Sequence, residues 1–128
     1  MSYYFNKKME GDFNDITQMI KNSLKKEGFG VLTEIDLQAK FKDSLNVKID
    51  KYLILGACNP MYAHKAISRD AKIGTLLPCN VIVQQVDEGI VEVTAIDPAA
   101  SMTIVNDEEI ALIAIEIGQK LKKALDIK

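Results

Sequence analysis

The chain contains few of the residues that usually carry catalysis or cross-link a fold. Two cysteines and one histidine occur among its 128 residues. Two thiols cannot build a disulfide framework, and in a cytoplasmic chain they are expected to stay reduced. No Ser-His-Asp order, phosphate-binding glycine loop, paired CxxC or HExxH is present. The sequence therefore gives no support to the enzyme classes that these motifs mark.

Long apolar runs and one-sided charge are also missing. The apolar stretch YLILGAC, residues 52–58, is far shorter than the roughly 20 residues of a membrane span, and the N-terminal MSYYFNKKME lacks the apolar region of a secretory signal. We therefore expect a cytoplasmic protein without a membrane partner. Acidic and basic residues number 18 and 16, and the lysines are scattered. This argues against nucleic-acid binding, because that function needs a basic face.

No linker composition or internal repeat divides the chain. Apolar residues make up 48% and charged residues 27%, which is typical of globular proteins. We therefore expect residues 1–128 to fold as a single domain.

The first half of the chain alternates between strand and helix patterns. Residues 2–9 predict an opening strand, and residues 29–36 predict a second one. Asp12 is expected to cap a helix that ends at Gly28, and Asp36 to cap a short helix. The apolar stripe of the first helix is predicted to contain Phe13, Ile16, Met19, Ile20 and Leu24, and that of the short helix Leu37, Phe41 and Leu45.

The second half opens with residues 52–58, a strand pattern that is apolar on both faces. Asn59-Pro60 predicts a helix start, because asparagine accepts from free amides and proline at the first helical position has no donor to lose. Residues 79–86 and 90–96 predict an antiparallel hairpin with Gly89 in its loop. Asn106 is expected to cap the last helix, whose stripe contains Ile110, Ile113, Ala114, Ile117, Leu121 and Leu125.

This order predicts an α+β domain. We expect a curved, mainly antiparallel sheet of about five strands, in the order β-α-β-β-β-β-α with short connecting helices, and both long helices on one face. In LILGA and NVIV apolar residues occupy both alternating sets, so the other face is not expected to be solvated. A second copy would cover that face, and we therefore expect a homodimer.

Four segments resemble one known family. They are GFGVLTEID at residues 28–36, ILGACNP followed by AHKA within residues 54–66, LLPCNVIV at residues 76–83, and DP before the last helix. They look like the domain-of-unknown-function 302 family of small prokaryotic proteins, over roughly residues 1 to 126. The resemblance implies a fold like that of the TATA-binding protein, and a dimer. Because fold does not determine function, it implies neither nucleic-acid binding nor an activity. It does imply that Glu34, Cys58, Asn59, Pro60, His64, Cys79 and Asn80 lie in the characteristic segments.

Both cysteines are predicted at strand ends. Cys58 precedes a helix start, whose positive end favours a thiolate, although a small buried residue would suit the same place. Cys79 opens the hairpin strand and allows the same two interpretations. His64 is predicted on the helix after Pro60, projecting back toward Cys58, where it would be a general base for a thiol nucleophile; the alternative is a surface or capping histidine.

The polar residues near the cysteines allow two readings as well. Cys58, His64 and Cys79 could bind a metal, with Glu34 as a fourth ligand. Glu34 and Asp36 share one face of their strand and could act as acid and base, although Asp36 already serves as a helix cap. Asn59 is most simply a cap. Asn80 lies in an apolar run, so we expect a buried amide that needs partners across a dimer axis or on a ligand.

We therefore expect a cytoplasmic homodimer that binds a small ligand or a metal. The expected rim site comprises Glu34, Cys58, Asn59, Pro60, His64, Cys79 and Asn80. One alternative is a thiol-dependent or redox enzyme that uses Cys58 and His64. The other is a structural or partner-binding module without a ligand. The sequence identifies no cofactor.

Overall fold

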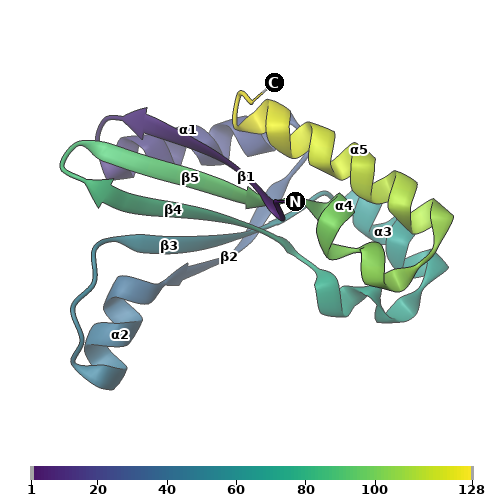
Figure 1. Ribbon diagram of the computed structural model, residues 1–128, viewed down its shortest axis with the longest axis horizontal. Coiled ribbons are helices and arrows are strands. Elements are labelled where there is room, and N and C mark those ends of the chain that lie inside the picture. The colour runs from purple at the N-terminus through teal and green to yellow at the C-terminus, as the bar shows by residue number, and fades with distance from the viewer. Residues whose placement is uncertain (1, 128) are drawn as a thin grey trace.

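The computed structural model describes residues 2–127, and its strands and helices follow the predicted order (Figure 1). The strands are β1 (Tyr4–Glu10), β2 (Gly30–Asp36), β3 (Tyr52–Cys58), β4 (Cys79–Asp87) and β5 (Ile90–Ile96). The helices are α1 (Phe13–Lys26), α2 (Leu37–Leu45), α3 (Pro60–Arg69), α4 (Pro98–Ser101) and α5 (Glu108–Ala124), and short 3-10 turns occupy Ala71–Leu76 and Thr103–Val105.

The strands form one antiparallel sheet in the order β1-β5-β4-β3-β2. The predicted hairpin of β4 and β5 is present, and Gly89 in its loop has the left-handed φ of +69°. The first strand pairs with the last, an arrangement that periodicity along the chain does not reveal. The predicted α+β class with a five-stranded antiparallel sheet is confirmed.

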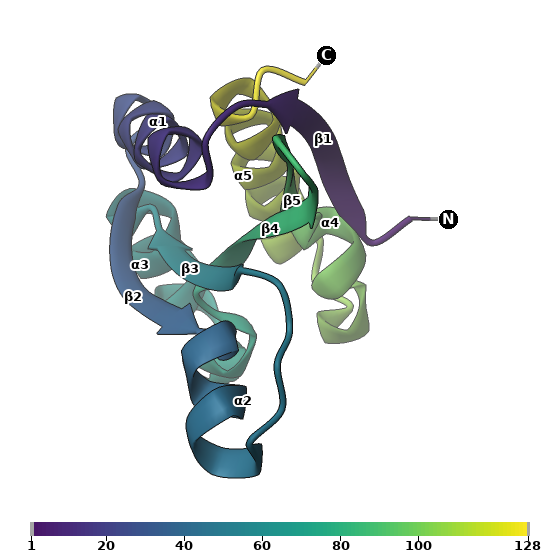
Figure 2. The same cartoon turned by 90° about the vertical axis from the view of Figure 1, so that its left-hand side faces the viewer.

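The main core lies between the sheet and the two long helices. In β4 and β5 the residues Val81, Val83, Val91, Val93 and Ala95 are fully buried, while their neighbours in the sequence point to the other face. Figures 1 and 2 show α1 and α5 together on the buried side of the sheet, as the sequence predicted. We call this side the helix face and the other side the open face.

The capping aspartates set the helix starts. Asp12 caps α1 by accepting from the Asp15 amide, and Asp36 caps α2 by accepting from the Ala39 amide, both as predicted. The prediction for α5 was wrong by one residue. Asp107 accepts from the amides of Glu109 and Ile110, whereas Asn106 ends the preceding 3-10 turn with a left-handed φ of 54°.

Two predicted helix stripes differ from the structure. Met19 is 48% exposed and does not belong to the buried side of α1, which consists of Phe13, Ile16, Thr17, Ile20 and Leu24. No residue of α2 is buried, although Leu37, Phe41 and Leu45 are spaced as one apolar stripe. Figure 2 shows the reason, because α2 projects away from the sheet on the side opposite to α1 and α5.

Among residues 2–127, the structure has no helix that combines the length and apolar character of a membrane span.

Candidate functional site

The two cysteines lie on neighbouring strands but on different faces of the sheet. In the pairing of β3 with β4, Cys79 is opposite Ala57, and both are buried under the helices. Cys58 follows Ala57 at the end of β3, so strand alternation directs it toward the open face. Both thiols are free, and Cys58 is only half-buried.

The environment of Cys79 opposes thiolate chemistry. Burial, and to a smaller extent the nearby Cys58, raises the pKa of the Cys79 thiol to about 11. A thiol with this pKa stays protonated at neutral pH and is a poor nucleophile or metal ligand. The alternative interpretation of Cys79 as a small buried residue therefore fits its surroundings.

Asn59 and Pro60 begin α3, as the sequence predicted, but the Asn59 side chain does not cap it. Its Nδ2 atom instead donates to the Glu27 carbonyl at 3.3 Å. The same nitrogen lies 3.1 Å from the place where a Cβ atom of Gly28 would be. Asn59 thus ties the end of α1 to the start of α3, which is a structural role.

His64 lies on the exposed side of α3, whereas Tyr62 and Ala66 form the buried side. Within residues 2–127 it takes part in no ion pair, and no hydrogen bond joins it to Cys58. The predicted Cys-His pair is therefore not formed in this structure.

Asn80 lies on the open face and is exposed in the single chain. It is opposite Gly56 of β3. A Cβ atom on Gly56 would overlap with Thr33 Oγ1 and lie 2.9 Å from Pro78 Cγ, which shows how closely these two side chains cover the backbone there. The Asn80 amide is therefore left facing solvent beside a tightly packed strand end.

The carboxylates of β2 lie on the helix face, away from Cys58 and Asn80. Glu34 forms an ion pair of 2.7 Å with Lys21 of α1, which accounts for a charge within an apolar strand. Asp36 is on the same face, as predicted, and caps α2. Neither residue approaches the cysteines as an acid, a base or a ligand.

The structure thus divides the predicted site. Cys58 and Asn80 share the open face at one end of the sheet, Cys79 and Glu34 lie on the helix face, and His64 is on α3. Within the part of the chain that the structure describes, no three His, Cys, Asp or Glu residues are grouped to hold a metal ion. The predicted metal set of Cys58, His64 and Cys79, with Glu34, is therefore not assembled in this structure.

Comparison with known proteins gives a family without an activity. The family model described as "Domain of unknown function DUF302" matches residues 5–127. The chain belongs to the DUF302 family. A solved structure described as the uncharacterized conserved protein DUF302 from Bacillus stearothermophilus is similar to it over 98% of each chain, with 26% identity and a TM-score of 0.91. Among the curated proteins, none matches this chain.

In this DUF302 chain the open face carries a row of apolar side chains. The strand pairings align Ile35 of β2, Ile54 of β3 and Ile82 of β4 in one row across the sheet. Ile35 is 46% exposed, and the other two are half-buried. The alternating pattern of the strands predicted an apolar face, but the row depends on the register and could not be read from the sequence.

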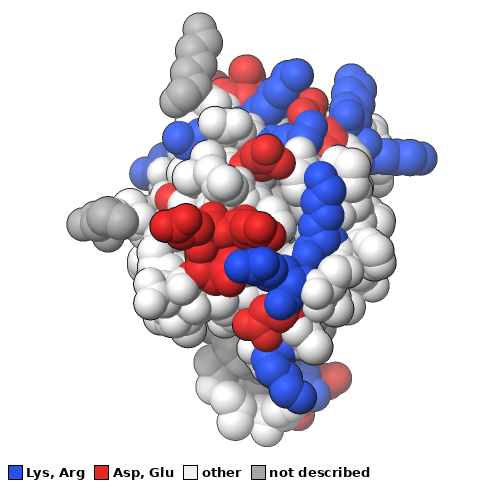
Figure 3. Space-filling view, turned by 90° about the vertical axis from the view of Figure 1, so that its right-hand side faces the viewer, with Lys and Arg blue, Asp and Glu red and all other residues white. Residues whose placement is uncertain are grey.

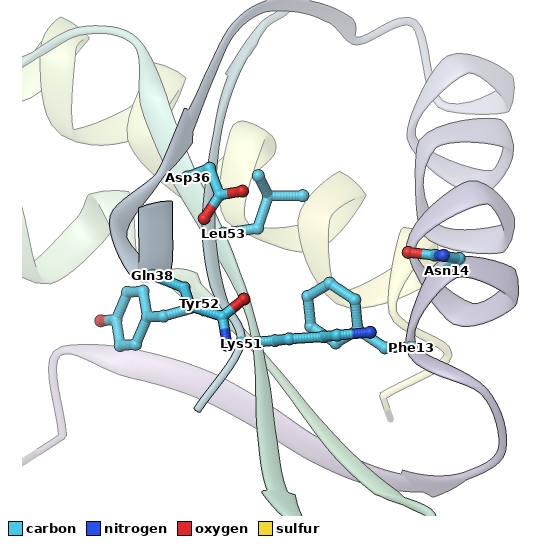
Figure 4. A pocket seen from close by; sticks show the side chains of 7 residues that line it. All are labelled: Phe13, Asn14, Asp36, Gln38, Lys51, Tyr52 and Leu53. Carbon is cyan, nitrogen blue, oxygen red and sulfur yellow. The ribbon is translucent and has the colours of Figure 1, made fainter. Parts of the chain in front are cut away.

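A small cavity lies at the other end of β3, and no motif in the sequence predicted it. The cavity is lined by Phe13, Asn14, Asp36, Gln38, Lys51, Tyr52 and Leu53, which come from α1, the β2–α2 junction and the start of β3 (Figure 4). Asp36 is the only residue of this cavity that the sequence analysis named as a possible acid or base. Its other members occur in segments without any recognisable motif.

The end of the molecule near the start of α5 carries both signs of charge. Figure 3 shows acidic side chains gathered next to basic ones on this face. Here Arg69 contacts Asp107 at 3.1 Å and Glu109 at 3.4 Å. The pKa of Asp107 is lowered, mainly by the hydrogen bond from the Ile110 amide and then by Arg69. These ion pairs join α3 to the start of α5.

Proposed function

We propose that this protein is a cytoplasmic homodimer that binds a small ligand at the end of the open face, beside Cys58 and Asn80. The observation that carries the proposal is the open face itself, where an apolar row leads to an exposed amide and a half-buried thiol. A cytoplasmic location is consistent with the two free thiols.

The dimer is proposed because two apolar surfaces lack cover on the same side of the sheet. One is the row of Ile35, Ile54 and Ile82, and the other is the α2 stripe of Leu37, Phe41 and Leu45. Leu45 is 66% exposed. A second copy presents the same two surfaces, so a twofold arrangement lets α2 of each copy pack against the open face of the other.

The ligand position follows from the edge of this face. Asn80 offers an amide that can both donate and accept, and Cys58 offers a thiol on the adjacent strand. A Cβ atom on Gly30, the residue opposite Cys58, would meet no atom within 4 Å, so there is open space at this position. An apolar wall with a few polar groups at its margin is typical of small-molecule sites.

Nucleic acid and metal are not part of the proposal. Acidic and basic residues nearly cancel in number, and the candidate metal ligands are divided between the two faces. A thiol-dependent enzyme that uses Cys58 without His64 is kept as an outcome of the experiment below.

Light scattering tests the dimer. We expect the wild-type protein to have the mass of two chains, and Ile82→Lys to be monomeric because it places a charge in the middle of the row. Ile67→Lys is the matched control, since Ile67 is an isoleucine of α3 that is 44% exposed and lies outside the open face. A monomeric wild type would refute the dimer, and equal dissociation of the two variants would refute its placement on the open face.

Native mass spectrometry of freshly purified protein tests the ligand. The proposal predicts a reproducible bound mass that is lost in Cys58→Ser combined with Asn80→Ala, and kept in Cys79→Ala, which alters the helix face. A dimer that carries no added mass contradicts the ligand site and favours the structural module. Alkylation of Cys58 faster than that of free cysteine near neutral pH would instead favour the thiol enzyme.

A further inference from the structure

The cavity beside α1 is separate from the proposed rim site. It has a volume of about 120 Å³ and lies at the end of β3 opposite to Cys58. Phe13 and Leu53 form its apolar lining, and both belong to the core cluster or contact it on the helix face. The apolar lining of the cavity is therefore on the helix face, whereas Gln38 belongs to α2, which is part of the proposed dimer surface.

Two opposite charges face this cavity without pairing with each other. Neither Asp36 nor Lys51 forms an ion pair with any residue between 2 and 127. The Lys51 amine lies 5.4 Å from the centre of the Phe13 ring, and in Figure 4 its side chain extends past this ring toward α1. Asp36 is aligned with Leu53 on the other side of the cavity.

The Asp36 carboxylate has unused hydrogen-bonding capacity. The Asp36 carboxylate accepts one hydrogen bond, from the Ala39 amide at 3.0 Å. A carboxylate can accept about four hydrogen bonds, so one oxygen and most of its lone pairs are free for a ligand. An ammonium group in the cavity would thus be attracted to Asp36 without disturbing the cap of α2.

The side nearest α1 suits a negative group. Lys51 supplies a positive charge, and the Asn14 side chain supplies amide donors. The first amides of a helix have no acceptor within the helix, and at α1 the Asp12 side chain accepts a hydrogen bond from the amide of Asp15. The amides of Phe13 and Asn14 remain without a helical partner at the positive end of α1. These groups together can bind a carboxylate, whereas the helix end alone would not make a site.

We propose that this cavity binds a small zwitterion, a free α-amino acid or a molecule of similar size that carries one ammonium and one carboxylate group. The ammonium group contacts Asp36, and the carboxylate group contacts Lys51 and Asn14. The cavity volume of about 120 Å³ limits the ligand to a small molecule.

Titration of ¹⁵N-labelled protein with defined probes tests the proposal. The probes are glycine and L-serine as zwitterions, acetate as the carboxylate alone, and methylammonium as the cation alone. We expect the zwitterions to shift the amide signals of Asn14, Asp36, Gln38 and Leu53 in a saturable manner. Each single ion should bind about tenfold more weakly or worse, because it loses one charge-assisted contact.

Matched variants check which residues hold the probe. Lys51→Gln and Asp36→Asn should each weaken glycine binding by about tenfold, and Asp36→Asn keeps the helix cap because asparagine caps as well as aspartate. Lys48→Gln and Asp50→Asn are the controls, because these neighbouring charges do not line the cavity. They should leave the affinity unchanged.

Three results would overturn the proposal. The first is that neither glycine nor L-serine shifts these amides, and the second is that acetate binds as tightly as glycine, which would make the site a plain anion site. The third is that the control variants weaken binding as much as Lys51→Gln. None of these results depends on the dimer or on Cys58, so the proposed function stands or fails separately.

Discussion

Cys79 lies opposite Ala57 in the pairing of β3 with β4, and this register separates the two thiols of the chain. Cys79 is 4% exposed beneath the helices, whereas Cys58, one residue beyond Ala57, is half-buried at the strand end. Two cysteines in similar sequence contexts therefore have different environments. Their chemical behaviour should differ in the same way.

The first prediction concerns thiol accessibility. In the native protein a thiol reagent such as Ellman's reagent should modify Cys58 promptly and Cys79 only after unfolding, because the Cys79 thiol is buried and protonated. Cys58→Ser should thus show no rapid reaction, while Cys79→Ala should show one reactive thiol. Equal rates for the two cysteines of the native wild type would contradict this assignment.

The second prediction is a loss of stability at alkaline pH. The folded state raises the pKa of Cys79 from its ordinary value of 9.0 to about 11, so between these values the unfolded state releases the proton first. The contribution of the Cys79 thiol to the free energy of unfolding is fully present below pH 9.0 and is lost as the pH rises toward about 11. The slope should be about 1.4 kcal/mol per pH unit within that window.

Urea unfolding of the wild type and of Cys79→Ala measures this slope. Lysines and tyrosines titrate in the same range in both proteins, so the difference between their free energies of unfolding isolates the thiol. The difference should shrink as the pH rises through the window. A constant difference would mean that Cys79 ionises equally well in the folded protein.

The third prediction concerns the strand position opposite Asn80. Gly56→Ala should lower the free energy of unfolding by about 1–3 kcal/mol, because the new Cβ atom would overlap with Thr33 and Pro78. Adding Thr33→Ala should recover part of this loss. Gly30→Ala is the control within a strand, since a Cβ atom there would meet no atom within 4 Å. Chemical denaturation of the four proteins gives the comparison, and equal effects of the two glycine substitutions would argue against close packing at Gly56.

The local elements could be predicted because their signals lie within a few residues. Asp12 and Asp36 mark helix starts through side chains that bond amides three residues later. The start of α5 was predicted one residue early, because asparagine and aspartate are equally good caps and Asn106 precedes Asp107 directly. Asn106 has a left-handed φ, which cannot be read from the sequence, and it therefore ends the preceding turn and leaves Asp107 as the cap.

The relations between distant segments could not be predicted. The sequence suggested a strand at residues 2–9 but not that β1 would pair with β5, because alternation identifies a strand and not its partner. For the same reason Glu34 looked like a functional carboxylate, since its partner Lys21 lies on a different element. The thiols were found correctly at strand ends, and only the register placed them on opposite faces.

The last prediction concerns Thr17, a residue of the buried side of α1 that is 8% exposed. Its Oγ1 atom is fully enclosed and has no hydrogen-bond partner within residues 2–127. An enclosed hydroxyl without a partner costs about 1–3 kcal/mol, and valine has the same branched shape without this cost. Thr17→Val should therefore raise the free energy of unfolding by about 1 kcal/mol.

Thr103→Val is the control, because the Thr103 hydroxyl donates to the Ala100 carbonyl at 2.8 Å and its loss removes a formed hydrogen bond. Urea midpoints measured at constant slope should rise for Thr17→Val and fall or stay equal for Thr103→Val. A fall for Thr17→Val would reveal that the hydroxyl is satisfied in solution, most simply by the helical carbonyl one turn earlier, and that α1 depends on this bond. The sign of the Thr17→Val effect therefore distinguishes an unpaired hydroxyl from a paired one on the buried side of α1.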